Sequence, residues 1–336
     1  MERLAGGDRA VGETPAPLRL GDPAVVLLRR LLAVEGRPLS LCSLGAPLEE
    51  LSGIIETLCA HGAEVSLVPE VGLSASRSGR LSAAEFLACR KPGSWPAAAL
   101  CLVSAGSTQD VAAHWAQRGF ADGVVVSADY QTHGRGRQGR RWFSESGRNL
   151  LASFVLRDEH LHPLGALRVA LAVYDALAPW VGDCLRLRWP NDVVAGGRKL
   201  AGTLIEPLPS GGAVVGVGIN VNQSMQAVPG RVARPATSLL ELLGRPVDRM
   251  EVLSALANEL EGWCLRGRGD EGAILEAYRE RCATLGRAIT VVTRAGRVAG
   301  VATGLGAAGE LLVDAGGSRR VALLAGDVVE TRQGEE

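Results

Sequence analysis

The sequence predicts an α+β protein built around a mixed β-sheet, and two patterns lead to this class. Across residues 97–284, short apolar runs with strand character alternate with stretches of helical periodicity. Within residues 185–219, three strand-like runs follow one another through links too short for a crossover helix, which implies antiparallel pairing. Residues 21–90 are mainly helical in pattern, whereas residues 285–330 form short β runs broken by glycine. We therefore expect three domains with these bounds, after a disordered tail over residues 1–20.

The first domain has the pattern of a winged helix-turn-helix. Residues 23–34 fit one amphipathic helix, and residues 47–60 fit a second that ends at a His-Gly pair. A short hairpin is expected over residues 64–73, and helices followed by a small hairpin are typical of such a domain. Residues 91–96 (Lys-Pro-Gly-Ser-Trp-Pro) are expected to be a linker.

The second domain is expected to alternate strands and helices. The run 185–189 alternates like a half-buried strand and stops at Pro190, because proline cannot continue a ladder. The expected strands are 98–104, 123–128, 150–156, 185–189, 198–206 and 213–219, and the expected helices are 108–117, 164–181, 247–265 and 271–284.

The third domain is expected to be a small SH3-like β-barrel. From residue 286 onward, glycine interrupts the chain at short intervals and no helical periodicity remains. The expected strands are 289–293, 297–304, 311–314 and 320–324.

Composition narrows the possible classes of protein. The net charge is zero, so no global field attracts nucleic acid or an anionic membrane. No apolar run reaches spanning length, and the first residues lack the apolar stretch of a signal peptide, so we expect a soluble, cytoplasmic protein. The seven cysteines are scattered without a CxxC pair, which indicates neither a disulfide framework nor a zinc site.

The most informative segment is a glycine- and arginine-rich stretch, residues 134–141, which we call the Gly/Arg loop. Four arginines and three glycines lie within eight residues between two expected strands. Glycine lets the backbone turn its N–H groups toward an anion, and arginine adds forked donors for carboxylate and phosphate oxygens. The loop therefore suits a polyanionic ligand. A solvated basic loop or an RNA-binding tract is the alternative, although the motif occurs only once.

A second signal comes from the choice between the two basic residues. Of the 36 basic residues only Lys91 and Lys199 are lysines, so the chain uses arginine almost wherever a cation is needed. An ammonium group is a compact point charge, unlike the planar guanidinium. We infer that position 199 needs that point charge, with chance retention of a surface lysine as the alternative.

Six motifs follow in a fixed order, and each alone is weak. They are Ser107-Thr108-Gln109, Gln131 with Gly134 to Arg140, Trp189-Pro190-Asn191-Asp192, Lys199-Leu200-Ala201-Gly202, Gly216-Val217-Gly218-Ile219-Asn220 and Ala236-Thr237-Ser238-Leu239. Together they resemble the biotin protein ligase family over residues 104–329. The resemblance implies a mixed-sheet catalytic domain like that of class II aminoacyl-tRNA synthetases, with an SH3-like C-terminal domain. Bifunctional members add an N-terminal winged helix that binds the biotin operon operator.

The resemblance implies ATP-dependent ligation in two steps. The biotin carboxylate attacks the α-phosphate of ATP, which gives biotinyl-5′-adenylate and pyrophosphate. A lysine of the biotin carboxyl carrier protein then attacks the adenylate and releases AMP. The first step joins two anions, so it needs fixed positive charge, with Mg²⁺ bridging phosphate oxygens. Water would hydrolyse the adenylate, so the Gly/Arg loop is expected to close over it.

The same resemblance assigns roles to individual residues. Lys199, Arg135 and Arg137 are expected to be catalytic, and Asp192 or Asn191 to lie near the metal. The expected biotin-binding residues are Ser107, Thr108, Gln109, Gln131, Arg135, Gly136, Arg137, Lys199 and Gly202. The expected ATP-binding residues are Gly134, Arg137, Arg140, Trp142, Asn191, Lys199, Gly216, Gly218 and Asn220. Among these, Gly202, Gly216 and Gly218 are expected to give the ligand clearance above the backbone.

Several of these residues also have a purely structural interpretation. Ser107 precedes an expected helix and can be its N-cap. Asp192 and Asn220 can be turn residues next to strands, and Trp142 can belong to the hydrophobic core.

The chain departs from the family pattern in two places. Gln109 stands where the family usually has asparagine, and the extra methylene moves the amide by roughly an ångström. The candidate recognition helix begins Leu48-Glu49-Glu50, and no lysine or arginine occurs from Cys42 to Ser76. Because phosphate contacts drive nucleic-acid affinity, we hypothesise a winged-helix relic used for packing or regulation rather than for binding operator DNA.

Three other functions compete with the ligase hypothesis. A lipoate ligase shares the fold and the adenylate chemistry, but the complete Gly/Arg loop argues against it. The acidic helix argues against a biotin-responsive transcription repressor, and Lys199 with the loop arginines argues against an inactive binding module. The carrier protein is expected to dock by pairing with an edge strand, and a homodimer through the central sheet is a family expectation.

Overall fold

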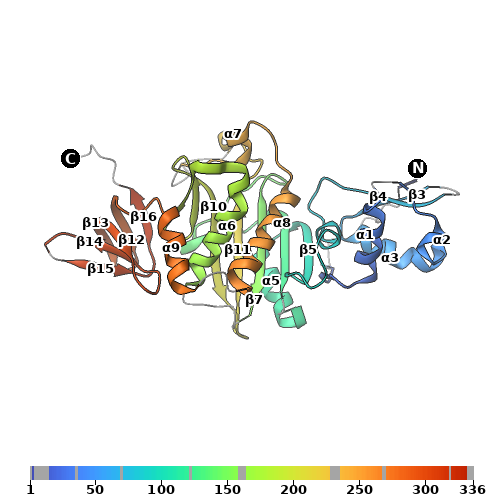
Figure 1. The fold of residues 1–336 in the computed structure, drawn as a ribbon, viewed down its shortest axis with the longest axis horizontal. Helices are drawn as coiled ribbons and strands as arrows, with labels where there is room; N and C mark the ends of the chain where they lie inside the picture. Colours follow the sequence, from blue (N-terminus) through green and yellow to red (C-terminus); the bar gives the residue numbers. More distant parts are fainter. Residues whose placement is uncertain are drawn as a thin grey trace.

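The computed structural model contains three units in a row, with the smaller units at opposite ends of a central one (Figure 1). The central unit carries a mixed sheet and helices, which confirms the predicted α+β class. The structure describes residues 2–3, 15–34, 37–68, 71–120, 123–157, 164–227, 235–266, 270–317 and 319–330.

The central sheet has eight strands in the order β2-β5-β6-β7-β11-β10-β9-β8. Among these strands only β5 and β6 pair in parallel, and every other neighbouring pair is antiparallel. The predicted antiparallel run therefore exists, with the short strand β9 inserted between β8 and β10. The strands are β2 (Leu18–Arg19), β5 (Ala98–Ala105), β6 (Val124–Gln131), β7 (Leu150–Leu156), β8 (Leu185–Arg188), β9 (Asp192–Ala195), β10 (Arg198–Pro207) and β11 (Ala213–Ile219).

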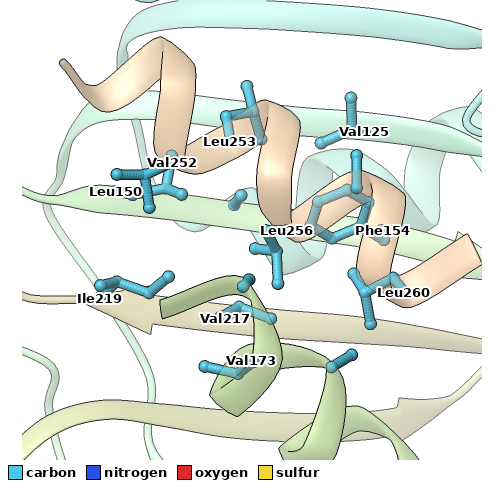
Figure 2. Close-up of a cluster of buried hydrophobic side chains, with 14 of the residues drawn as sticks. Val125, Leu150, Phe154, Val173, Val217, Ile219, Val252, Leu253, Leu256 and Leu260 are labelled. Atoms are coloured by element: carbon cyan, nitrogen blue, oxygen red, sulfur yellow. The ribbon is translucent and has the colours of Figure 1, made fainter. Parts of the chain in front are cut away.

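Helices cover the two faces of this sheet unequally. On one face, Phe154 and Val217 pack against α6 and α8, which contribute residues such as Leu256 (Figure 2). On the other face, Val155 and Val214 pack against α5 near one end of the sheet. The helices of this unit are α5 (Thr108–Trp115), α6 (Gly165–Val181), α7 (Leu239–Leu243), α8 (Arg249–Leu260) and α9 (Glu271–Arg281), with π-helical turns η1 (Ala116–Phe120) and η6 (Glu261–Leu265).

Helices α8 and α9 each begin at an aspartate that caps them. The carboxylate of Asp248 accepts from the N–H of Met250 at the start of α8, and Asp270 accepts from Ala273 at the start of α9. The predicted helix over residues 247–265 is α8 continued by η6. The predicted helix over residues 271–284 ends earlier, because Cys282 has an extended backbone.

The N-terminal unit packs helices on a small sheet of order β1-β3-β4. The guanidinium of Arg29 on α1 donates to the main-chain oxygens of Leu87, Ala88 and Arg90 at the end of α4. Arg90 in turn donates to Asn258 of α8, which ties this unit to the central one. The elements are β1 (Glu2–Arg3), α1 (Pro23–Leu32), α2 (Leu41–Leu44), α3 (Leu48–Ala60), β3 (Glu64–Val68), β4 (Gly72–Ser76) and α4 (Ala83–Ala88).

The tail predicted for residues 1–20 is wrong at its C-terminal end, and most of its remainder lies outside the described residues. Leu18 and Arg19 belong to the central sheet as strand β2, which pairs with β5, and Leu18 is buried. Two residues are too short for any alternation to be visible in the sequence, so only the tertiary pairing identifies this strand.

The C-terminal unit is an antiparallel sheet of order β15-β14-β13-β12-β16. The turn between β13 and β14 attaches it to the central unit, because the indole Nε1 of Trp189 donates to the main-chain oxygen of Gly309 at 3.0 Å. Arg279 of α9 also donates to the oxygen of Leu305. The strands are β12 (Ala288–Thr293), β13 (Gly296–Leu305), β14 (Leu311–Asp314), β15 (Arg320–Leu323) and β16 (Asp327–Glu330).

Elements missing from the sequence prediction are short. For α4 the sequence held a signal, because Ser82 and Glu85 form the serine–glutamate spacing of a capping box and Ser82 does cap the helix. The other missed α-helices and β-strands have two to five residues each, and they are β1, β2, α2, β9, α7 and β16. No helix among the described residues is long and apolar enough to cross a membrane.

Candidate active site

A cavity of about 370 Å³ lies over the face of the central sheet that α5 leaves uncovered. Ser153, Gly216 and Gly218 line it, and they follow the same alternation as Val155 and Val214, which face α5. Because these residues are small, the space above this part of the sheet remains open, and we call them the floor of the cavity. The volume falls within the range of small-molecule sites.

All but one of the predicted binding residues line this cavity. The exception is Gly134, whose main-chain oxygen accepts from the N–H of Trp142 at 3.0 Å. The lining set is Ser107, Thr108, Gln109, Gln131, Arg135, Gly136, Arg137, Arg140, Trp142, Asn191, Asp192, Lys199, Gly202, Gly216, Gly218 and Asn220.

The sequence prediction also missed residues of the cavity wall. Ser153 carried a usable signal, since it is a polar residue inside an apolar strand. Asp327 carried none, because it comes from the far C-terminal sheet. The other additional lining residues are Arg141, Phe143, Leu151, Ala152, Thr203, Leu204, Val217, Gln223, Met225 and Ala236.

At one side of the cavity, buried polar side chains form a chain of hydrogen bonds. The side-chain oxygen of Gln131 accepts from the N–H and the hydroxyl of Thr108 at 2.7 and 3.0 Å. The Thr108 hydroxyl also lies 2.8 Å from that of Ser153. Ser107 stands at the N-cap position of α5, but its side chain makes no capping bond and is buried. The position of a cap is therefore confirmed, whereas the side-chain cap is absent.

Gln109 fits the space above Gly216. A Cβ at residue 216 would lie 2.8 Å from the side-chain oxygen of Gln109, so only glycine leaves room for the longer amide. The amide nitrogen donates to Glu206 at 2.9 Å. The amide oxygen is buried without a hydrogen-bond partner. Because such atoms are rarely left unsatisfied, this oxygen marks a place for a ligand donor.

The Gly/Arg loop folds back on itself. The N–H of Gly136 donates to the main-chain oxygen of Arg140 at 2.7 Å, and the N–H of Arg140 donates to Arg137. Between them, Gln138 and Gly139 both adopt positive φ, at 57° and 72°. A non-glycine residue in this region is uncommon, so the turn is a specific feature of the loop.

Three loop arginines have distinct carboxylate or amide partners. Arg135 contacts both oxygens of Asp110 at 2.8 Å and Glu206 at 2.9 Å. Arg137 donates to the amide oxygen of Asn191 at 2.9 Å, and Arg140 contacts both oxygens of Asp327. Partial burial alone would lower the pKa of Arg135, but its hydrogen bonds to the two carboxylates outweigh that effect and raise the pKa. Arg135 therefore remains cationic.

Lys199 lies across the cavity and pairs with Asp192. The Nζ atom is 2.6 Å from a carboxylate oxygen of Asp192 and 5.4 Å from the centre of the Trp142 ring. The ion pair is half-protected, since the lysine side chain is 27% exposed and the aspartate side chain 7%. Asp192 is thus a partner of Lys199 rather than a simple turn residue.

Trp142 belongs to the cavity wall rather than to the hydrophobic core. Its indole Nε1 is buried without a hydrogen-bond partner, which is expected of a donor that binds a ligand. A Cβ at Gly218 would lie 2.6 Å from the Trp142 ring, and a Cβ at Gly202 would lie 2.8 Å from Nζ of Lys199. The glycines therefore give clearance to side chains of the site, whereas the sequence argument assigned that clearance to the ligand.

The two predicted asparagines hold neighbouring segments in place. The Asn191 amide donates to the oxygen of Thr203 at 2.7 Å while it accepts from Arg137. The Asn220 amide donates to the oxygen of Thr237 at 2.9 Å, which fixes the segment after β11. Asn220 therefore does act as a structural residue at the end of a strand, as its alternative interpretation predicted. It also lines the cavity.

The described residues hold no group of three or more His, Cys, Asp or Glu that could bind a metal ion. The predicted metal residue Asp192 is a single carboxylate next to a lysine. Magnesium is usually bound through one or two carboxylates together with substrate phosphates. The donor set therefore fits a magnesium ion that arrives with a nucleotide and does not fit a resident metal.

Comparison with known proteins extends these findings. Residues 103–224 match the model of the biotin/lipoate A/B protein ligase family. The chain is 39% identical over 236 residues to the biotin–[acetyl-CoA-carboxylase] ligase of Mycobacterium tuberculosis, which covers 68% of this chain and 86% of that protein. It is 34% identical to the bifunctional ligase/repressor BirA of Bacillus subtilis, but over 44% of this chain and only 47% of that protein.

Among solved structures, the chain resembles the biotin protein ligase of Aquifex aeolicus in complex with biotin and ATP. The TM-score is 0.61 at 28% sequence identity, and the match covers 69% of this chain and 99% of the other.

Proposed function

The chain belongs to the biotin protein ligase family, and on this premise we propose that it is an ATP-dependent biotin ligase. It forms biotinyl-5′-AMP from biotin and ATP and then transfers biotin to a lysine of a biotin carboxyl carrier protein. The observation that carries this proposal is the convergence of Lys199 and the Gly/Arg loop on one cavity that also holds a buried polar cluster.

The buried polar cluster suits the ureido head of biotin. Hydrogen bonds already link Thr108, Gln131 and Ser153, so their arrangement is set before a ligand binds. The unpartnered amide oxygen of Gln109 offers an acceptor to a ureido N–H. A site built on hydrogen bonds rejects analogues that lack the matching groups, because its buried polar atoms would be left unpaired.

The opposite side of the cavity suits the reacting groups. In the first step, a carboxylate oxygen of biotin attacks the α-phosphorus of ATP, and the bond to the β-phosphate oxygen breaks to release pyrophosphate. Lys199 is the cation placed to neutralise the carboxylate and the α-phosphate, with Arg135 and Arg137 on the loop side. Asp192 orients the ammonium group through their ion pair. Trp142, Asn191 and Arg140 are proposed as nucleotide contacts.

In the second step, the amine of the acceptor lysine attacks the acyl carbon of the adenylate. The bond to the phosphate oxygen breaks, AMP leaves, and the amine proton is lost as the amide forms. The Gly/Arg loop is proposed to exclude water during both steps, because hydrolysis of the adenylate would waste ATP. Asp192 is the carboxylate that would hold a magnesium ion carried in by ATP, and that ion would offset charge on the phosphates.

The two end units are proposed to keep the domain types expected from the sequence. We interpret residues 21–90 as a winged-helix relic and residues 285–330 as an SH3-like domain, around a catalytic domain at residues 97–284. The acidic helix α3, with Glu49 and Glu50 in its first turn, supports the proposal that the N-terminal unit does not bind DNA. A salt-sensitive gel shift with operator-like DNA at submicromolar protein would overturn this. Homodimerisation and a cytoplasmic location remain predictions.

The deciding experiment is transfer of labelled biotin to an acceptor domain in the presence of ATP and Mg²⁺. A parallel assay of biotin-dependent exchange between pyrophosphate and ATP isolates the first step. Competition between biotin and lipoate in this exchange separates the two ligase types. Exchange that depends on lipoate and not on biotin would show that the protein is a lipoate ligase instead.

A further inference from the structure

An ion pair ties the Gly/Arg loop to the C-terminal sheet. The guanidinium of Arg140 contacts both carboxylate oxygens of Asp327 at 2.6 and 2.7 Å. Asp327 is the first residue of β16 and lines the cavity. The two residues stand 187 positions apart in the sequence, so only the tertiary fold brings them together.

The fold holds Asp327 in a fixed direction. Its neighbour Val328 is buried in the C-terminal sheet, so the alternation of a strand turns Asp327 toward the other side. Gly326 has no room for a Cβ because Val291 of β12 occupies that space. Asp327 also pairs in register with Val292 of β12.

The C-terminal sheet is also anchored to the central unit at the turn that holds Gly309. Trp189 donates to Gly309 at the turn between β13 and β14, and a Cβ at Gly309 would lie 2.9 Å from Leu167 of α6. Asp327 therefore belongs to a sheet that has its own attachment to the central unit. The Gly/Arg loop, by contrast, is an irregular segment.

Arg140 can hold Asp327 and still serve a ligand. Both contacts to Asp327 use the Nη2 atom, and Nε donates to the main-chain oxygen of Arg137 at 3.2 Å. The N–H groups of Nη1 donate to neither Asp327 nor Arg137. Because the Arg140 side chain is 43% exposed, a phosphate in the cavity can reach it.

We propose that Asp327 is a positioning residue that holds the Gly/Arg loop over the cavity through Arg140. The C-terminal unit would thereby contribute to nucleotide binding without touching the reacting atoms. This inference rests on the proposed function, since it assigns Arg140 to the ATP phosphates. An exposed ion pair often contributes little, so the bidentate contact and the shielded carboxylate of Asp327 carry the argument.

The first test measures the loop itself with trypsin under native conditions. The loop offers cleavage after Arg137, and mass spectrometry follows this one bond in the full-length protein. For Asp327→Asn we expect cleavage about tenfold faster, because proteolysis tracks the open population and a charged hydrogen bond is lost. Asp327→Glu keeps the charge and is expected to restore most of the protection. The control Asp314→Asn, on β14 of the same sheet, is expected to match the wild type.

The second test measures the consequence for the substrates. In pyrophosphate exchange, Asp327→Asn is expected to raise KM for ATP about tenfold, while biotin binding by calorimetry stays within about twofold. A purely structural role would instead weaken both ligands and the thermal stability together.

Wild-type cleavage and wild-type KM for ATP in Asp327→Asn would overturn the inference. Since the trypsin assay needs no ligation, it decides the role of Asp327 even if the wild type shows no biotin-dependent exchange. That latter result would instead refute the proposed function.

Discussion

The two faces of the central sheet are built from the same strands but have opposite properties. On the helix-covered face, Phe154 and Val217 are buried against α6 and α8. On the open face, the neighbouring residues Ser153, Gly216 and Gly218 form a cavity floor. Apolar side chains of the helices pack against the covered face, whereas the open face retains buried polar atoms without hydrogen-bond partners.

This difference teaches where stability and function reside. Apolar residues on the covered face gain free energy from burial, and they gain it before any ligand is present. The open face presents buried atoms of Gln109 and Trp142 that have no hydrogen-bond partner in the protein and that a ligand can satisfy. Substitutions on the two faces should therefore change different measured quantities.

The largest effect is expected for Lys199→Ala on the open face. Loss of the ammonium group should reduce biotin-dependent pyrophosphate exchange by about 10³-fold or more, or ~4 kcal/mol of activation free energy. Loss of the ion pair with Asp192 should lower the free energy of unfolding by only ~1–3 kcal/mol, so the protein stays folded. Lys199→Arg keeps a charge for Asp192 and serves as the control for folding. Normal turnover in Lys199→Ala would refute the assigned role.

The next largest effect is expected for Leu256→Ala on the covered face. This fully buried residue of α8 leaves a cavity among apolar side chains, which should cost ~3 kcal/mol of unfolding free energy. A thermal melt checks this, and KM values for biotin and ATP should remain those of the wild type. A change in KM comparable to the loss of stability would show that the two faces are coupled.

A smaller effect is expected for Gly218→Ala. The new methyl group would approach within 2.6 Å of the Trp142 ring, which must shift into the cavity. We expect KM for ATP in pyrophosphate exchange to rise about tenfold, or ~1.4 kcal/mol. Gly304→Ala on β13 meets no atom within 4 Å and is the matched control. Equal kinetics in both variants would contradict the role given to the glycine floor.

The smallest effect is expected for Gln109→Asn, which restores the residue usual in the family. The shorter amide loses its contact with Glu206, while another hydrogen bond can still form with a ligand. We expect KM for biotin to change by about threefold, in keeping with one neutral hydrogen bond of ~1 kcal/mol or less. Gln117→Asn on the exposed turn η1 is the control. A loss of a hundredfold would make Gln109 a principal biotin contact.

The sequence alone determined several of the elements and part of the membership of the site. The strands at 150–156, 213–219 and 311–314 have the predicted bounds, because short, largely apolar runs encode them. The Gly/Arg loop and Lys199 were identified from composition and motif order, and both line the cavity. Such signals are local, so they can be recognised without any knowledge of the fold.

Only the tertiary structure decided which side chains meet. No local pattern pairs Lys199 with Asp192, places Gln109 over Gly216 or joins Arg140 to Asp327. These contacts depend on strand order, on the register between β9 and β10 and on the docking of the C-terminal sheet. Residue identity fixes what a side chain can bind, but long-range packing fixes which partner lies within a hydrogen-bond length of it.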